Sequence, residues 1–182
     1  MRVLPGRLAL AAVSLLLVLL DQGTKAWVEA VLPFGARVDV LPVFAWVHVE
    51  NTGAAFSLFA DGSGWQRWFF VVLACAFGGW LLWELARLGE DDGWIAWAYA
   101  FILGGAGGNL VDRVETGAVT DFVLVHWFDA AYFPAFNVAD VAITIGATIW
   151  IGLVVLELLG RGPLAHVDEG ASAENGNPHD AP

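Results

Sequence analysis

Residues 136–159, FNVADVAITIGATIWIGLVVLELL, join a polar start to a long apolar run, and this stretch decides the fold class. About 20 apolar residues in a helix are enough to cross the hydrocarbon core of a bilayer. Asp140 stands near the start of the run. An ionised carboxylate costs roughly 2.5–3.5 kcal/mol at the centre of a membrane helix and less toward an interface. The stretch therefore predicts a membrane helix that begins at a functional polar site.

Three further apolar stretches of this kind occur at residues 8–31, 65–86 and 94–111. Hydrophobic residues make up 58% of the 182-residue chain and charged residues 15%. The mean hydropathy is +0.67, and such values are too apolar for a soluble domain of this size. The 21 Gly and 10 Trp agree with close helix contacts and with aromatic anchors at the membrane surface. We predict an all-α polytopic membrane protein with four transmembrane helices.

The segments that connect and follow these spans differ in composition. The loop at residues 34–64 holds two stretches of alternating apolar and polar residues, which predict short strands. A second connection on the same side spans residues 114–135. Residues 1–160 are thus expected to form one membrane domain. Residues 161–182, rich in small, polar and acidic side chains, are expected to form a disordered tail.

Nearly every costly polar group in the apolar part of the chain is predicted to meet at one membrane face. Successive spans run in opposite directions, so the ends of the first and third spans lie beside the start of the fourth. The loop and the second connection open on that same face. The residues brought together are Asp21, Lys25, Asn51, Asn109, Arg113, Asp121, Asn137 and Asp140. Convergence of this kind is typical of a functional site.

Basic residues predict which side of the membrane this face occupies. Four arginines flank the opposite face, namely Arg2, Arg7, Arg87 and Arg161. The site face carries Arg37 and Arg67, together with Lys25 and Arg113, which lie close to acids and are discounted as paired. The positive-inside rule then places both termini and the tail in the cytoplasm. The predicted site is therefore extracytoplasmic.

Several of these polar groups also have a structural interpretation. Asp21 and Lys25 are spaced i,i+4, which predicts a helical ion pair that supports the site, with direct chemistry as the alternative. Arg113 either orients an aspartate or pairs with a neighbouring acid. Asp121 and Asp140 are either an acid–base pair acting on a bound water or buried structural carboxylates that cap the fourth helix. Asn137 is the better candidate for that cap.

Metal and disulfide sites are not expected from the pattern of ligand-type residues. The chain has one cysteine, Cys75, which lies in an apolar segment. Its four histidines are scattered, with no spacing typical of metal ligands. The aromatic residues between the third and fourth spans predict an interfacial belt, or a wall of the site. These are Trp127, Phe128, Tyr132, Phe133 and Phe136.

Five stretches, in this order and spacing, closely resemble the motifs of signal peptidase II, the prolipoprotein signal peptidase family. They are residues 21–25 (DQGTK), 51–57 (NTGAAFS), 104–113 (GGAGGNLVDR), 119–122 (VTDF) and 136–140 (FNVAD). The resemblance covers about residues 8–160. It implies a bacterial inner-membrane aspartic endopeptidase with four membrane helices and a small extracytoplasmic β-sheet. The implied substrate is a diacylglyceryl-modified prolipoprotein, cut just before the lipid-bearing cysteine.

The resemblance also implies roles for single residues. The catalytic pair falls on Asp121 and Asp140, and the accessory positions fall on Asp21, Lys25, Asn51, Asn109, Arg113 and Asn137. Two carboxylates in one site share a proton, so the charged one activates water while the protonated one supports the developing oxyanion. Sequence does not assign which aspartate holds that proton. We expect the two asparagines of the membrane spans and Arg113 to orient the aspartates, and Asn51 to bind substrate backbone.

No cofactor is needed for this chemistry. The expected partners are the lipidated precursor and membrane lipids, and no obligate protein partner is inferred. The formal net charge of -11 argues against nucleic acid as a partner. The alternative function is a small proton-coupled transporter, which predicts polar groups along a path through the bilayer rather than at one face. A structural assembly factor is a second alternative, but it leaves the paired aspartates unexplained.

Overall fold

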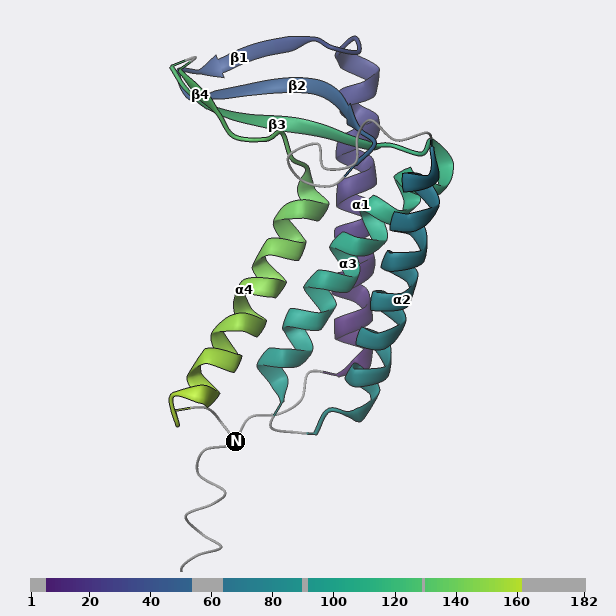
Figure 1. Cartoon of the computed structure of the whole chain (residues 1–182), viewed down its shortest axis with the longest axis vertical. Helices are drawn as coiled ribbons and strands as arrows, with labels where there is room; N and C mark the ends of the chain where they lie inside the picture. Colours follow the sequence, from purple (N-terminus) through teal and green to yellow (C-terminus); the bar gives the residue numbers. More distant parts are fainter. Residues whose placement is uncertain (1–5, 54–63, 90–91, 129, 162–182) are drawn as a thin grey trace, which may run out of the picture.

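The structure, a computed structural model, describes residues 6–53, 64–89, 92–128 and 130–161. Within that part, four helices are long and apolar enough to cross a membrane, and a four-stranded sheet lies at one end of them (Figure 1). This arrangement confirms the predicted fold class. The predictions for residues 54–63 of the first loop and for the tail at 162–182 lie outside the described residues.

The four helices begin and end close to the predicted spans. They are α1 (Arg7–Val31), α2 (Trp65–Arg87), α3 (Gly93–Glu115) and α4 (Val138–Leu158). The largest difference is at the end of α3, which continues past residue 111 and carries Asp112 and Arg113 on its last turn. The fourth helix begins at Val138 because Asn137 is its N-cap, with an extended backbone and a side chain that accepts a hydrogen bond from the Asp140 amide.

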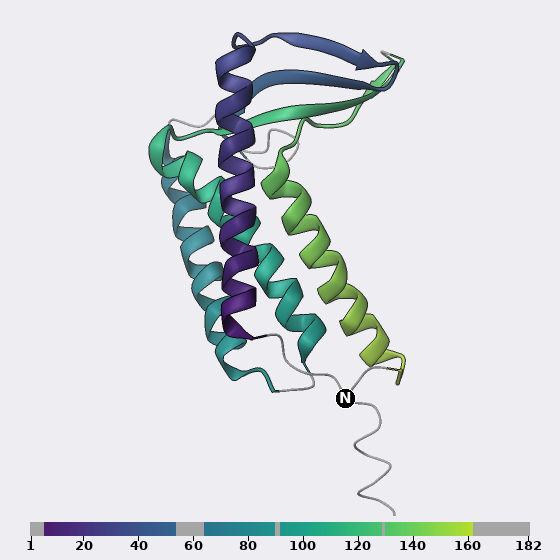
Figure 2. The ribbon, with the colours of Figure 1, turned by 180° about the vertical axis from the view of Figure 1, so that it is seen from behind.

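Helix α3 packs against the other three helices, and Figures 1 and 2 show it between α1 and α4 with α2 beside it. Its glycines permit this close packing. A methyl group at Gly105 would lie 2.3 Å from the carbonyl oxygen of Ala139 in α4. One at Gly104 would lie 2.8 Å from Cβ of Leu17 in α1. The close helix contacts that the glycine content predicted are therefore confirmed for this segment.

The sheet has the order β1-β2-β3-β4, and all its strand pairs are antiparallel. Its strands are β1 (Arg37–Leu41), β2 (Phe44–Asn51), β3 (Val119–Trp127) and β4 (Ala131–Tyr132). The two strands predicted in the first loop are confirmed. The prediction of residues 114–135 as a plain connection missed β3 and β4. Strand β3 matters most, because its pairing sets Asp121 opposite Val49 and Val119 opposite Asn51.

Buried polar side chains gather at the sheet end of the helices. Within the described residues they are Asp21, Lys25, His48, Gln66, Asn109, Asp112, Thr120, Asp121, His126 and Asn137. Each lies in the sheet, in the first turn of α2, at the start of α4, or in the parts of α1 and α3 nearest the sheet. This distribution matches the predicted convergence on one face. It does not match the path across the bilayer that a transporter requires.

Candidate active site

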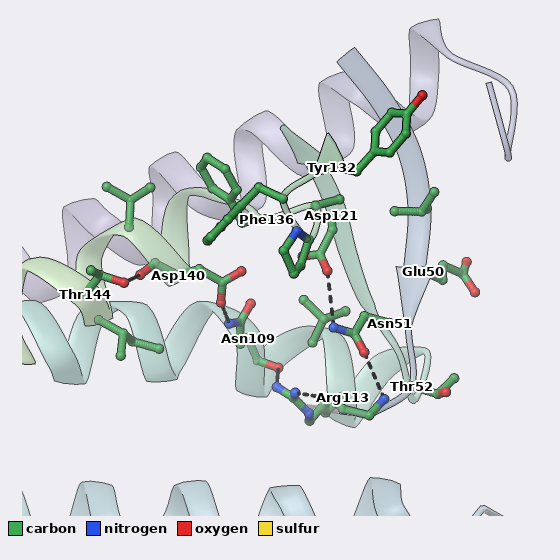
Figure 3. A pocket seen from close by; sticks show the side chains of 18 of the residues that line it. Glu50, Asn51, Thr52, Asn109, Arg113, Asp121, Tyr132, Phe136, Asp140 and Thr144 are labelled. Carbon is green, nitrogen blue, oxygen red and sulfur yellow. Dashed lines mark hydrogen bonds between the residues drawn. The ribbon is translucent and has the colours of Figure 1, made fainter. Parts of the chain in front are cut away.

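The two predicted catalytic aspartates lie in one cavity, of about 970 Å³, at the junction of the sheet and the helices. Asp121 is the third residue of β3, and Asp140 is in the first turn of α4. Figure 3 shows that their side chains enter the cavity from these two different elements. The other polar lining includes Asn51, Asn109 and Arg113. The cavity therefore unites five of the eight predicted site residues.

Asp121 is almost completely buried, with 3% of its surface exposed. Asn137 donates from Nδ2 to its Oδ1 at 2.7 Å, and Asn51 donates from Nδ2 to its Oδ2 at 3.3 Å. Burial raises the pKa of Asp121 to about 7, and the charge of Asp140 adds to the rise, while the two amide donors oppose it. Asp121 can therefore hold a proton near neutral pH, where an ordinary aspartate is ionised.

Asp140 occupies the third helical position of α4 and takes part in its cap. Its Oδ2 accepts from the Asn137 backbone amide at 3.3 Å, and the Asn137 side chain accepts from the Asp140 amide at 2.9 Å. This capping box confirms Asn137 as the cap and shows that Asp140 completes it. The other carboxylate oxygen of Asp140 accepts from Asn109 Nδ2 at 2.8 Å. One carboxylate oxygen of Asp140 thus caps the helix, and the other accepts a hydrogen bond from Asn109, which lines the cavity.

The predicted ion pair in α1 is present and buried. Lys25 Nζ lies 2.7 Å from Asp21 Oδ2, and the two side chains are 3% and 1% exposed. Asp21 also accepts, through Oδ1, a 2.9 Å hydrogen bond from the backbone amide of Ala139. That amide is in the first turn of α4, so a carboxylate from α1 satisfies one of the free donors at the start of α4.

Asp112 was not among the predicted site residues, yet it is buried in this cluster. Its Oδ2 lies 2.5 Å from Lys25 Nζ, and its Oδ1 accepts from Gln22 Nε2 at 2.6 Å. The sequence did contain a signal, since Asp112 follows Asn109 by three residues and therefore shares its helix face. Of the two interpretations of Arg113, the alternative of a pair with a neighbouring acid does not hold for Asp112, because Asp112 pairs with Lys25.

Arg113 and Asn51 both contact Gly53, in the turn after β2. The Arg113 guanidinium donates to the backbone carbonyls of Asn109 at 3.3 Å and Gly53 at 3.2 Å, and it lies over the ring of Phe70. Arg113 therefore holds the turn after β2 rather than bonding an aspartate directly. Asn51 accepts from the Gly53 amide at 3.0 Å and donates to Asp121, so it serves the carboxylate in this state.

The aromatic residues of the second connection separate into two groups. Tyr132, Phe133 and Phe136 line the cavity, so the prediction of an aromatic wall is correct for them. Trp127 and Phe128 are exposed, as expected for an interfacial belt.

The match to a family model decides the family. A model described as signal peptidase (SPase) II matches residues 13–156. This chain belongs to the signal peptidase II family. The matched range contains all eight of the predicted site residues, from Asp21 to Asp140.

Individual relatives and solved structures agree. The lipoprotein signal peptidase of Pseudomonas fluorescens is 52% identical over 143 residues, which is 78% of this chain and 84% of that protein. The lipoprotein signal peptidase of Pseudomonas aeruginosa is 46% identical over 162 residues, which is 88% of this chain and 95% of that protein. A solved bacterial membrane enzyme superposes with a TM-score of 0.78 at 26% identity, covering 90% of this chain and 97% of that one. The resemblance read from the five motifs is confirmed.

Proposed function

We propose that this member of the signal peptidase II family is an aspartic endopeptidase that cuts diacylglyceryl-modified prolipoproteins just before the lipidated cysteine. One observation carries the proposal: Asp121 and Asp140 come from separate elements into one cavity, and each accepts a side-chain amide donor. The relatives named lipoprotein signal peptidase support the substrate class.

The proposed mechanism uses the two carboxylates and a water molecule. Asp121, with its pKa raised to about 7, holds the shared proton. Asp140 is the proposed base, because its carboxylate lies at the start of α4 and accepts a hydrogen bond from Asn109 Nδ2, both of which favour an anion there. Asp140 takes a proton from water as the oxygen attacks the scissile carbonyl, and Asp121 donates a hydrogen bond to the developing oxyanion. A proton then passes to the leaving nitrogen, and the carbon–nitrogen bond breaks.

The substrate is proposed to reach the cavity from the bilayer. Val141 and Ile145 of α4 line the cavity and are also partly exposed on the outside of the helix bundle. Acyl chains can therefore stay in hydrocarbon beside α4 while the peptide reaches the aspartates. The enzyme is proposed to lie in the bacterial inner membrane, with the sheet end extracytoplasmic. Arg7 and Arg87, at the opposite end of the helices, support a cytoplasmic location of that end.

The decisive experiment compares the aspartate variants on a lipidated precursor peptide in detergent. Asp121→Asn and Asp140→Asn should each lower kcat by at least ~10²-fold, the usual contribution of a general acid or base. The double variant should be hardly slower than either single one, because the pair acts as a unit. Asp39→Asn, with a 60% exposed side chain on β1, is the charge-matched control and should cleave normally. Near-normal cleavage by either single variant would overturn the proposal.

The same assay tests the lipid requirement. A diacylglyceryl anchor raises the local concentration of the cleavage site at the membrane boundary. The peptide with a free cysteine should therefore remain uncut under conditions that consume the lipidated one. Equal rates for the two peptides would show that the acyl chains do not contribute.

A further inference from the structure

A single buried ammonium group stands at the start of the hydrogen bonds that reach both aspartates. Lys25 Nζ contacts Asp21 Oδ2 at 2.7 Å, Asp112 Oδ2 at 2.5 Å and Asn109 Oδ1 at 2.9 Å. An ammonium group has three N–H donors and no acceptor, so these three oxygens use its full capacity. Its position and its donor directions are therefore fixed.

The ammonium group determines which way the Asn109 amide points. Asn109 Oδ1 accepts from Lys25 Nζ at 2.9 Å and from Asn137 Nδ2 at 3.2 Å, and its Nδ2 donates to Asp140 Oδ1 at 2.8 Å. A rotated amide would set its NH2 group against the ammonium and its carbonyl oxygen against the carboxylate. Both contacts would be repulsive in this buried setting. Asn109 must therefore present its donor to Asp140.

The same constraint passes to the second asparagine. Asn137 Nδ2 donates to Asn109 Oδ1 and, at 2.7 Å, to Asp121 Oδ1, while Asn137 Oδ1 accepts from the Asp140 amide. The orientation of this amide is thus determined at both ends: Asn109 requires the donor Nδ2 on one side, and the Asp140 amide requires the acceptor Oδ1 on the other. An unbroken series of hydrogen bonds joins the ammonium to both carboxylates.

We propose that Lys25, held in place by Asp112 and Asp21, is a positioning residue that sets the donor direction of Asn109 and Asn137, so that each catalytic aspartate receives an N–H donor. The inference rests on the proposed function, because it takes Asp121 and Asp140 as the catalytic pair. It gives Asp112 a role beside Asp21, and Gln22, bonded to Asp112 Oδ1 at 2.6 Å, keeps that carboxylate turned toward Lys25.

Lys25→Met tests the proposal, because it removes the ammonium group and keeps an unbranched side chain. For folded enzyme, kcat should fall about tenfold, the equivalent of one charge-assisted hydrogen bond, with little change in KM. The alkaline limb of the pH–rate profile should move to higher pH. The charged groups that act on Asp121 are Asp140, Lys25 and Arg113. Of these, the Lys25 charge lowers the pKa of Asp121, and so does the hydrogen bond from Asn137. Losing the Lys25 charge therefore raises the pKa of Asp121, which moves the alkaline limb to higher pH.

A double-mutant cycle separates positioning from general stabilisation. If Lys25 acts through Asn109, then Lys25→Met should add little to the loss of kcat already caused by Asn109→Leu. Multiplied losses in the double variant, or an unmoved alkaline limb, would overturn the proposal. Arg87→Met removes a cation that lies over Trp83 at the other end of the helices, and it should leave kcat and the pH profile unchanged.

Asp112→Asn repeats the cycle in a variant that should fold, since it leaves the Lys25–Asp21 pair with balanced charge. It should lower kcat on its own and add little to Asn109→Leu, and an unchanged kcat would contradict the role given to Asp112. Failure of the proposed function would be seen separately, as an active Asp121→Asn enzyme. Failure of this inference alone would leave Asp121→Asn inactive while the losses at Lys25 and Asn109 multiply.

Discussion

Replacing Asp121 by asparagine should change how the stability of the folded protein depends on pH. Burial, and then the charge of Asp140, raises the pKa of Asp121 from 3.8 to about 7. A carboxyl group whose pKa is higher in the folded protein than in the unfolded chain does not oppose folding as long as it is protonated in both. The stability that depends on Asp121 is therefore fully present below pH 3.8 and is lost as the pH rises through about 7. At about 1.4 kcal/mol for each pKa unit, the loss is on the order of 4 kcal/mol.

The assay measures the unfolding of purified wild type and Asp121→Asn in mild detergent at pH 4 and pH 8. The variant lacks the titrating group, so it does not lose this stability as the pH rises. Relative to wild type, its unfolding free energy should therefore be about 4 kcal/mol more favourable at pH 8 than at pH 4. The cost of setting an amide beside the Asn51 donor is the same at both pH values and cancels in the comparison. Asp39→Asn should follow wild type.

A difference that is equal at pH 4 and pH 8 would refute this reasoning. It would mean that Asp121 ionises in the folded protein as readily as in the unfolded chain. The proposal that Asp121 holds the shared proton would then fail as well, because both depend on the same buried carboxyl.

Two further predictions concern packing and the helix cap. Gly105→Ala should lower the unfolding free energy by about 1–3 kcal/mol, because the new methyl group would meet the Ala139 carbonyl oxygen at 2.3 Å. Gly79→Ala should not destabilise the protein, because a methyl group there would meet nothing within 4 Å beyond its own stretch of helix backbone. Equal melting temperatures for the Gly105→Ala and Gly79→Ala variants would contradict the close approach of α3 and α4. Asn137→Ala should cost about 1 kcal/mol of capping energy, and kcat should fall about tenfold because Asp121 loses a donor. A loss of stability with normal kcat would limit Asn137 to capping.

The sequence predicted those features that depend on neighbouring residues. The membrane helices are recognisable because the length and apolar character of each are local properties. The i,i+4 spacing of Asp21 and Lys25 was enough to predict their ion pair, now seen at 2.7 Å. Alternating helix direction alone brought Asn109 toward Asp140, which it contacts at 2.8 Å.

What the sequence did not predict depends on partners far away in the chain. Strand β3 was missed although it is rich in β-branched and aromatic residues, because its partner β2 lies about 70 residues earlier. Arg113 stands between acids in the sequence, and it was expected to orient an aspartate, with an ion pair to a neighbouring acid as the alternative. Its observed partner across the cavity is the backbone carbonyl of Gly53, a group that every residue has and no sequence pattern marks.

The bond from the Ala139 amide to Asp21 has a consequence for how the protein is made. Its two partners are 118 residues apart, so α1 enters the membrane long before α4 is synthesised. Lys25, the ion-pair partner of Asp21, lies in the same helix and is made with it, whereas Asp112 is contributed later by α3. The aspartates of the site are contributed by the elements synthesised last, β3 and α4. If the two aspartates are the catalytic pair proposed above, a growing chain lacks one of them until α4 has been inserted, and the order of synthesis would itself keep the nascent chain inactive.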